Sequence, residues 1–243
     1  MKGSLPGRGG ALVTGSAKGI GRALVLALAA DGIDVAVHYR SSARAAEQVV
    51  ARAQALGVRA VALRADVTVE RSAHDLVDAA AAALGGLRVL VTNVGDYHKG
   101  PLGELDSGTW HQMLASNLNA TFYTCQRGVP IMRAAGGGRI VNLGYAGAEL
   151  LKARPAVVAY QVAKTGVILY TKALARSEAA NGITANVLSP GVMDNSVTKP
   201  LDEIPMGRTG SLDELAAGLR FFLSPEGRYV TGTHLEVAGG WNL

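Results

Sequence analysis

A glycine-rich turn near the N-terminus constrains this chain more than any other feature of its sequence. Gly15, Gly19 and Gly21 lie between a short apolar run at residues 11–13 and an alanine- and leucine-rich run at residues 22–30. This order predicts a strand, a tight turn and a helix, whose first N–H groups and dipole attract a pyrophosphate. The Gly-x3-Gly-x-Gly spacing lacks the Gly-Lys-Ser/Thr ending of a P-loop, which argues against a nucleoside triphosphate site.

Strand-like and helix-like patterns alternate along the whole chain. Strands are expected at residues 11–14, 34–39, 58–65, 87–92, 139–143, 183–188 and 233–237. Helices are expected from residue 19 to about 31, at 43–56, 69–84, 107–133 and 157–179, and after Ser211, which forms a capping box with Glu214. Without any linker, this pattern predicts one domain at residues 1–243. Its fold is α/β, a single doubly wound (Rossmann-type) parallel sheet with helices on both faces.

Ligands of such sheets bind at the carboxyl ends of the strands, near the point where the strand order reverses. Six predicted loops meet at that edge, and they carry the Gly15 turn, Arg40, Asp66, Asn93, Gly144 and Pro190. A substrate loop is expected at about residues 192–208, where Met193, Leu201 and Met206 would shape a pocket together with residues 96–98.

The composition narrows the class of protein. The chain carries a net charge of +5, but its basic residues are scattered, so no nucleic-acid partner is predicted. No apolar run is long enough to span a bilayer, and residues 1–10 lack the apolar core of a signal peptide. The single cysteine, Cys125, excludes an internal disulfide and a cysteine-based zinc site, and we expect it to be buried. A cytoplasmic protein without a metal site is therefore predicted.

Tyr160 and Lys164 lie four residues apart in a predicted helix, so their side chains share one face. A neighbouring ammonium stabilises a phenolate and brings the tyrosine pKa closer to neutrality. Such a pair can pass a proton to a developing alkoxide while a hydride arrives from a nicotinamide. On its own, the spacing fits an amphipathic helix with a surface lysine better, so the assignment depends on the other motifs.

Six motifs stand in one order along the chain: Thr14-Gly15-x3-Gly19-x-Gly21, Asp66-Val67, Asn93-Val94-Gly95, Asn117, Tyr160-x3-Lys164 and Ser189-Pro190-Gly191. Together they resemble the short-chain dehydrogenase/reductase family over nearly the whole chain. The resemblance is greatest to the 3-oxoacyl-carrier-protein-reductase-like branch. The turn around Lys18 and the segment at residues 38–41 are also similar to pteridine reductases.

The resemblance implies a role for each matching position. Tyr160 would be the general acid, Lys164 would hold the nicotinamide ribose and lower the tyrosine pKa, and Asn117 would organise a water relay. The catalytic set is thus Tyr160, Lys164, Asn117 and, as argued below, Tyr145. The predicted cofactor-binding set is Gly15, Lys18, Gly19, Ile20, Gly21, Tyr39, Arg40, Ser41, Asp66, Val67, Asn93, Gly95, Tyr160, Lys164, Pro190, Gly191 and Val192.

The predicted cofactor is NADP(H). A site for NAD usually has an acidic residue at the end of the second strand, which binds the ribose 2′-hydroxyl. Residues 38–42 contain none, and Asp34 lies at the opposite end of that strand. Arg40 and Lys18 can both reach a 2′-phosphate, with a hydrogen bond from Ser41.

Tyr145 is the main departure from the family pattern. The family usually has its catalytic serine at this position, and no serine lies between Asn142 and Tyr160. The spacing from Tyr145 to Tyr160 is also two residues longer than is common in the family. Two hypotheses remain open: either the Tyr145 hydroxyl donates to the substrate oxygen, or the ring is only a pocket wall.

These observations favour an NADPH-dependent oxidoreductase that transfers a hydride to a small carbonyl substrate, 3-oxoacyl-like or another ketone, with Tyr160 as proton donor. A pteridine-type C=N reductase is one alternative. A nucleotide-binding regulator with lost or weak catalysis is another, because the usual serine is replaced by Tyr145. A nucleic-acid binder has only the basic pI in its favour.

A homotetramer, or a homodimer, is also predicted. The two long helical stretches carry more apolar residues than one face of a sheet needs to cover, for example Leu118, Ala120, Phe122, Val167, Leu169, Leu174 and Ala175. In the family, the matching helices pair across a two-fold axis. The apolar face of these two helical stretches is therefore expected to contact a second copy of the chain.

Overall fold

A seven-stranded parallel sheet forms the centre of the computed structural model, which describes residues 9–242. The strand order is β3-β2-β1-β4-β5-β6-β7. The strands are β1 (Gly10–Val13), β2 (Val35–Tyr39), β3 (Ala60–Arg64), β4 (Leu87–Thr92), β5 (Gly138–Leu143), β6 (Ile183–Pro190) and β7 (His234–Val237). Each bound lies within two residues of the predicted one, and the predicted fold class is confirmed.

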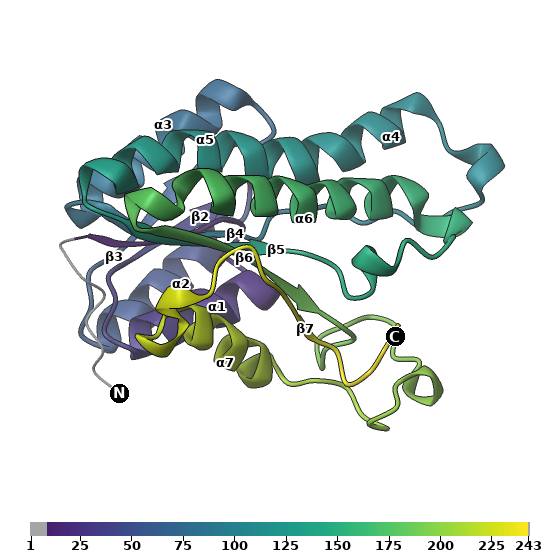
Figure 1. The fold of residues 1–243 in the computed structure, drawn as a ribbon. Coiled ribbons are helices and arrows are strands. Elements are labelled where there is room, and N and C mark those ends of the chain that lie inside the picture. The colour runs from purple at the N-terminus through teal and green to yellow at the C-terminus, as the bar shows by residue number, and fades with distance from the viewer. Residues whose placement is uncertain (1–8, 243) are drawn as a thin grey trace.

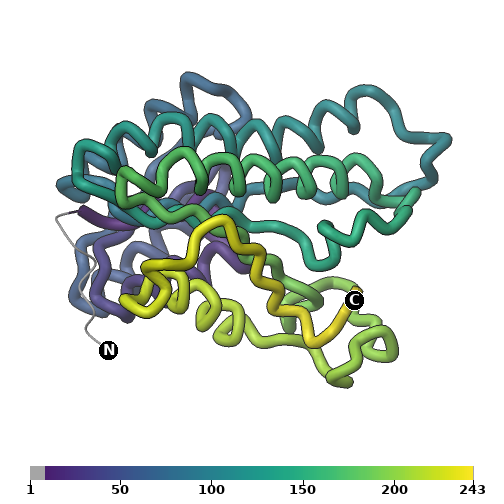
Figure 2. Tube along the Cα trace, viewed as in Figure 1, coloured from purple at the N-terminus to yellow at the C-terminus, as the bar shows by residue number. Residues whose placement is uncertain are grey.

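Helices cover both faces of the sheet (Figure 1). One layer contains α1 (Gly19–Ala30), α2 (Ala43–Ala55) and α7 (Leu212–Leu223), and the other contains α3 (Glu70–Leu84), α4 (Ser107–Met113), α5 (Ala120–Ala134) and α6 (Val158–Glu178). The predicted capping box of α7 is present, with Ser211 and Glu214 bonded reciprocally. Figure 2 shows that the last described residues run to the same edge of the molecule as the loop after β6.

Apolar strands hold the two layers together. The central strands β1 and β4 are buried on both faces, as is typical of a parallel sheet covered by helices. Cys125 is fully buried as predicted, and this burial raises the pKa of its thiol to about 12. Met193 was expected to shape the substrate pocket, but it is 1% exposed and packs in the core, with its side chain against Gly210.

The predicted helical stretch 107–133 contains an irregularity that the sequence pattern did not reveal. A π-helical turn at Leu114–Asn119 joins α4 to α5. Such a turn widens the helix locally and changes which side chains face inward, and it often occurs at functional sites. Here it carries the buried Asn117.

The sequence predicted neither a signal peptide at residues 1–10 nor a membrane-spanning segment. The expectation about residues 1–10 concerns a segment of which residues 1–8 lie outside the described range. Between residues 9 and 242, no helix combines the length and the apolar character needed to cross a membrane.

Candidate active site

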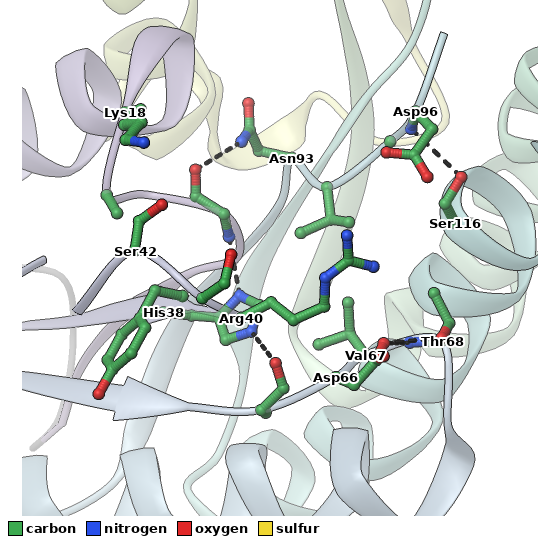
Figure 3. Close-up of a pocket in the computed structure, with 17 residues that line it drawn as sticks. Lys18, His38, Arg40, Ser42, Asp66, Val67, Thr68, Asn93, Asp96 and Ser116 are labelled. Atoms are coloured by element: carbon green, nitrogen blue, oxygen red, sulfur yellow. Dashed lines mark hydrogen bonds between the residues drawn. The ribbon is translucent and has the colours of Figure 1, made fainter. Parts of the chain in front are cut away.

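A cavity of about 300 Å³ opens at the carboxyl ends of β1 to β4, where the strand order reverses. Nine residues predicted to bind the cofactor line it: Gly15, Lys18, Tyr39, Arg40, Ser41, Asp66, Val67, Asn93 and Gly95. In Figure 3, the Arg40 side chain extends over this cavity, with Lys18 and Ser42 on one side and Asp66 and Val67 on the other. We call it the β1–β4 cavity.

The glycine turn is held against the neighbouring strand. Gly15 has φ +64°, and a Cβ on Gly21 would lie 2.5 Å from the Gly15 carbonyl oxygen, so the helix can approach the turn only without a side chain there. The Asn93 N–H donates to the Thr14 hydroxyl (2.8 Å), and the Asn93 amide donates to the Thr14 carbonyl (3.0 Å). Lys18 precedes α1 without a side-chain cap, which leaves the first helical N–H groups available to an anion.

His38 holds the same turn in place through a hydrogen bond to Gly15. The sequence analysis did not assign His38 to the site. The Gly15 N–H donates to His38 Nδ1 (2.8 Å), while Nε2 lies 3.2 Å from the Ala65 carbonyl oxygen. Because Nδ1 must accept and Nε2 must donate, the ring is neutral and carries its proton on Nε2. Burial lowers the pKa of His38 below its ordinary value, and the nearby Ala65 carbonyl and Asp66 charge oppose this only in part.

The charges around the β1–β4 cavity suit a phosphate near the end of β2. Lys18 and Arg40 both line it, and neither forms a described ion pair. The Asp66 carboxylate accepts from the Thr68 hydroxyl (2.7 Å) and N–H (3.0 Å). Those bonds, together with the charge of Arg40, hold the pKa of Asp66 below its usual value. Ser42 caps α2 without a side-chain bond, so its hydroxyl is a further donor that sequence reasoning missed.

A second cavity of about 300 Å³ adjoins the first at Asn93 and Gly95. It contains three of the predicted catalytic residues, Asn117, Tyr160 and Lys164, and we call it the Tyr160 cavity. The other residues that line it are Ile20, Tyr97, Leu143, Gly144, Pro190 and Asn195. The structure thus brings the glycine turn, the helix pair and the Pro190 loop to one edge of the sheet.

Tyr160 and Lys164 extend from one face of α6, as predicted. The Lys164 ammonium donates to the Leu143 carbonyl (2.8 Å) and lies 5.7 Å from the centre of the Tyr160 ring. Burial lowers the pKa of Lys164 to about 8. Burial, followed by the neighbouring phenols of Tyr145 and Tyr97, raises the pKa of Tyr160. The sequence predicted that Lys164 would lower the pKa of Tyr160, but the shift is upward because burial dominates, so Tyr160 is a neutral phenol at neutral pH.

Asn117 is fully buried beside this pair, which excludes the surface position that a helical asparagine usually takes. Its amide nitrogen donates to the carbonyls of Asp96 (2.9 Å) and Met113 (3.0 Å), while its oxygen has no partner among the described residues. A Cβ on Gly95 would lie 2.2 Å from that oxygen and 3.4 Å from the Lys164 nitrogen. Gly95 therefore keeps open the space between an orphaned acceptor and an ammonium donor.

Tyr145 lies beside α6 but lines neither cavity. Its ring meets the Tyr160 ring edge-on, with 5.3 Å between centroids, and Tyr97 packs on Tyr160 in a similar way at 5.1 Å. The Tyr145 hydroxyl accepts a hydrogen bond from Arg154 (2.6 Å). Burial raises the pKa of Tyr145, and the charge of Arg154 acts in the opposite direction.

Ser189 is a serine near this site, and it cannot replace the missing one. Its hydroxyl lies 2.6 Å from His234 Nε2, and His234 Nδ1 lies 2.9 Å from a Glu149 carboxylate oxygen. These roles have the order of a nucleophile, a base and an orienting acid. Ser189 is 0% exposed, however, and a Cβ on Gly144 would lie 2.2 Å from its oxygen. We conclude that this chain of bonds fastens β7 to the loop after β5.

Comparison with known proteins places the chain in a family. A family model described as enoyl-(acyl carrier protein) reductase matches residues 15–242. A 3-oxoacyl-(acyl-carrier-protein) reductase FabG from Staphylococcus aureus (strain Mu50) is 33% identical over 239 residues, which are 95% of this chain and 96% of that protein. The chain belongs to the short-chain dehydrogenase/reductase family. It is therefore an NAD(P)-dependent oxidoreductase by family.

Solved structures of this family agree with the fold. A short chain dehydrogenase from Burkholderia cenocepacia J2315, in complex with NADP, has a TM-score of 0.91 at 36% identity and covers 98% of this chain and 99% of its own. A blue fluorescent protein from a metagenomic library, in complex with NADPH, has a TM-score of 0.91 at 34% identity, covering 99% of this chain and 100% of its own. Both structures are complexes with the phosphorylated nicotinamide cofactor.

Some predicted site residues lie outside both cavities. Gly19 and Gly21 shape the turn, Gly191 packs against Ala238, and Val192 is buried. Arg154 was not predicted at all, because nothing in the sequence spacing connects it to Tyr145. His38 and Ser42 had a usable signal, since they occupy the end of β2 and the start of α2, where a phosphate-binding loop lies.

Proposed function

We propose that this chain is an NADPH-dependent reductase of a small carbonyl substrate, such as a 3-oxoacyl group or another ketone. The observation that carries the proposal is the joining of two cavities at Asn93 and Gly95. One is lined by Lys18 and Arg40, and the other contains Tyr160 and Lys164. An extended dinucleotide requires a phosphate-binding cavity and a catalytic cavity side by side. Membership of the family supports hydride transfer as the reaction.

The residues present fit NADPH. Lys18, Arg40, Ser41 and Ser42 would hold the 2′-phosphate, and the start of α1 would hold the pyrophosphate. Asp66 and Val67 would contact the adenine, and Pro190 would contact the nicotinamide side. When bound, NADPH supplies the hydride.

In the reaction we propose, Tyr160 donates the proton. Its raised pKa keeps the hydroxyl protonated until an alkoxide, a much stronger base, forms on the substrate. Lys164 holds a positive charge below about pH 8 and thus stabilises the resulting phenolate. Asn117 and Lys164 face each other across the space that Gly95 leaves open, and they would pass a replacement proton toward Tyr160.

We further propose that Tyr145 donates a hydrogen bond to the substrate oxygen beside Tyr160, which is the donor hypothesis of the two stated above. Support comes from the edge-on contact of the two rings and from the Tyr145 hydroxyl, which accepts from Arg154 and lies near the Asn242 side chain. A lost donor of this kind typically costs about 10²–10³ in kcat.

We also propose that the chain forms a single catalytic domain and assembles as a homo-oligomer, a tetramer or a dimer. Three residues named above, Ala120, Val167 and Ala175, are buried within the chain and therefore cannot contact a partner in this fold. Apolar side chains elsewhere on α5 and α6 are exposed and support the proposal: Phe122 (39%), Val162 (43%) and Leu169 (71%).

The test is turnover of a ketone panel with NADPH by the wild-type protein, Tyr160→Phe and the matched control Tyr229→Phe. Tyr229 is 99% exposed, so its hydroxyl should not affect the reaction. We expect Tyr160→Phe to lose at least about 10² in kcat while its NADPH affinity is nearly unchanged. Near-normal turnover in Tyr160→Phe would contradict the mechanism. Tight NADPH binding by the wild type without oxidation of NADPH by any substrate would instead favour a nucleotide-binding regulator.

A further inference from the structure

Arg154 directs its positive charge at a single phenol. One guanidinium nitrogen, Nη1, donates to the Tyr145 hydroxyl (2.6 Å), and Nη2 donates to the side-chain oxygen of Asn242. Its central carbon lies 5.6 Å from the Tyr145 ring centre and 5.9 Å from that of Trp241. No carboxylate between residues 9 and 242 pairs with it. The half-buried cation is therefore partnered by neutral groups.

The bond from Arg154 determines what the Tyr145 hydroxyl can still do. A phenol oxygen has one proton to donate and can also accept. Arg154 lies on the accepting side of this oxygen, and the Asn242 side chain, like Arg154, lowers the Tyr145 pKa as a donor to the oxygen does. With both partners on the accepting side, the O–H group remains free to donate. A cation on the oxygen also withdraws electron density, which strengthens the bond that this O–H makes to a developing oxyanion.

Arg154 is itself held in place from the C-terminal segment. The Asn242 amide that accepts from Arg154 also donates to the Ala146 carbonyl (3.2 Å). The next residue of that loop, Gly147, donates its N–H to the Glu236 carboxylate (2.7 Å). The loop that carries Tyr145 is thus fixed by β7 and by Asn242, and Arg154 bridges Tyr145 and Asn242.

We propose that Arg154 is a positioning residue that orients the Tyr145 phenol and polarises its O–H toward the substrate oxygen. This inference rests on the proposed reductase function. It assigns to this chain a pair, Arg154 and Tyr145, that takes the place of a serine hydroxyl. Neither residue acts alone: Arg154 reaches the reaction only through Tyr145.

A double-mutant cycle tests the pair. We expect Arg154→Met to lower kcat roughly tenfold or more, because it retains length but removes the donor, and Arg154→Lys to recover part of the loss. In a Tyr145→Phe background, Arg154→Met should lower kcat no further. Lys99→Met, which removes an exposed charge from another loop near the site, is the matched control and should leave kcat unchanged. NADPH affinity, measured for every variant, checks that each one folds.

Equal losses from Arg154→Met with and without the Tyr145 hydroxyl would overturn the proposal, since Arg154 would then act on the fold. A second measurement is independent of turnover. Ultraviolet titration of phenolate absorbance, taken as the difference between proteins with Tyr145 and with Phe at this position, follows Tyr145 alone. Removing Arg154 should move this titration to higher pH, and an unchanged titration would also overturn the proposal. If the wild type reduces no substrate, the proposed function fails while the titration still decides the role of Arg154.

Discussion

Lowering the pH should reduce the free energy of unfolding of this protein because His38 becomes protonated. The variant His38→Asn should lack this contribution to the pH dependence. The buried ring accepts from Gly15 and donates to Ala65, so a second proton on Nδ1 would face the Gly15 N–H. The folded pKa is lowered by burial, whereas the unfolded chain keeps the ordinary value of 6.5. Below pH 6.5 the unfolded state therefore binds more protons than the folded state. Stability is complete above that pH and falls as the pH drops toward the folded pKa.

The size of the stability loss follows from the one additional proton that the unfolded state binds at His38. While the folded ring stays neutral, the loss approaches about 1.4 kcal/mol per pH unit below 6.5. Asparagine can accept from Gly15 but does not titrate, so the variant should lack this slope. It should also lose the Ala65 bond, which costs roughly 1–3 kcal/mol at every pH, and His38→Leu should lose both bonds, about twice as much.

The assay is urea unfolding at several pH values from 7.5 to 5.5, with all proteins at one concentration so that assembly contributes equally. The quantity of interest is the wild-type free energy of unfolding minus that of His38→Asn. We expect this difference to shrink by about 1 kcal/mol between the two ends of the range. A difference that stays constant, or grows in acid, would refute the reasoning, because His38 would then not be held neutral by the turn.

Three further predictions concern the cofactor, the reaction and the assembly. Arg40→Ala should weaken NADPH binding about tenfold or more while sparing NADH, because it removes charge-assisted bonds to the 2′-phosphate. The control is Arg52→Ala, which removes an exposed charge from α2 outside the cavity, and equal losses for the two cofactors in titration calorimetry would contradict the prediction. Because burial lowers the pKa of Lys164 to about 8, kcat/KM should fall as the pH rises above that value, and a profile that stays flat well above it would show that the ammonium is not needed. Light scattering should give an oligomer for the wild type and a smaller species for Leu169→Glu, but not for the control Leu56→Glu, and a wild-type monomer at micromolar concentration would end the assembly proposal.

Much of the site could be predicted because its signals are local. The Gly15 turn depends on residues next to one another in the chain, and the Tyr160–Lys164 pair depends only on helical spacing. The parallel sheet then brings the ends of the strands together, so Arg40 and Asn93 meet at one cavity although they come from different strands. Sequence order and fold class were sufficient for these residues.

Other features depend on packing that no short pattern encodes. Apolar residues on α5 and α6 gave no indication of which side they face, so Val167 was expected at an interface and lies in the core. The π-helical turn that carries Asn117 has no clear sequence signal. The bond from Arg154 to Tyr145 crosses a loop whose course is determined by contacts with Asn242, about 90 residues later in the chain.

Tyr145 should therefore be considered together with the residues that make room for it. A Cβ on Gly144 would lie 2.5 Å from a Val187 methyl group, so the backbone before Tyr145 lies directly against β6. The ring that follows fills the space between Tyr160 and Trp241, and Arg154 closes the far side at the hydroxyl. A serine placed here would have a hydroxyl several ångströms short of that position and would leave the Arg154 cation without its phenol. We conclude that exchanging this one residue would not restore a serine-type site, because the position of the Tyr145 hydroxyl depends on contacts from three separate segments.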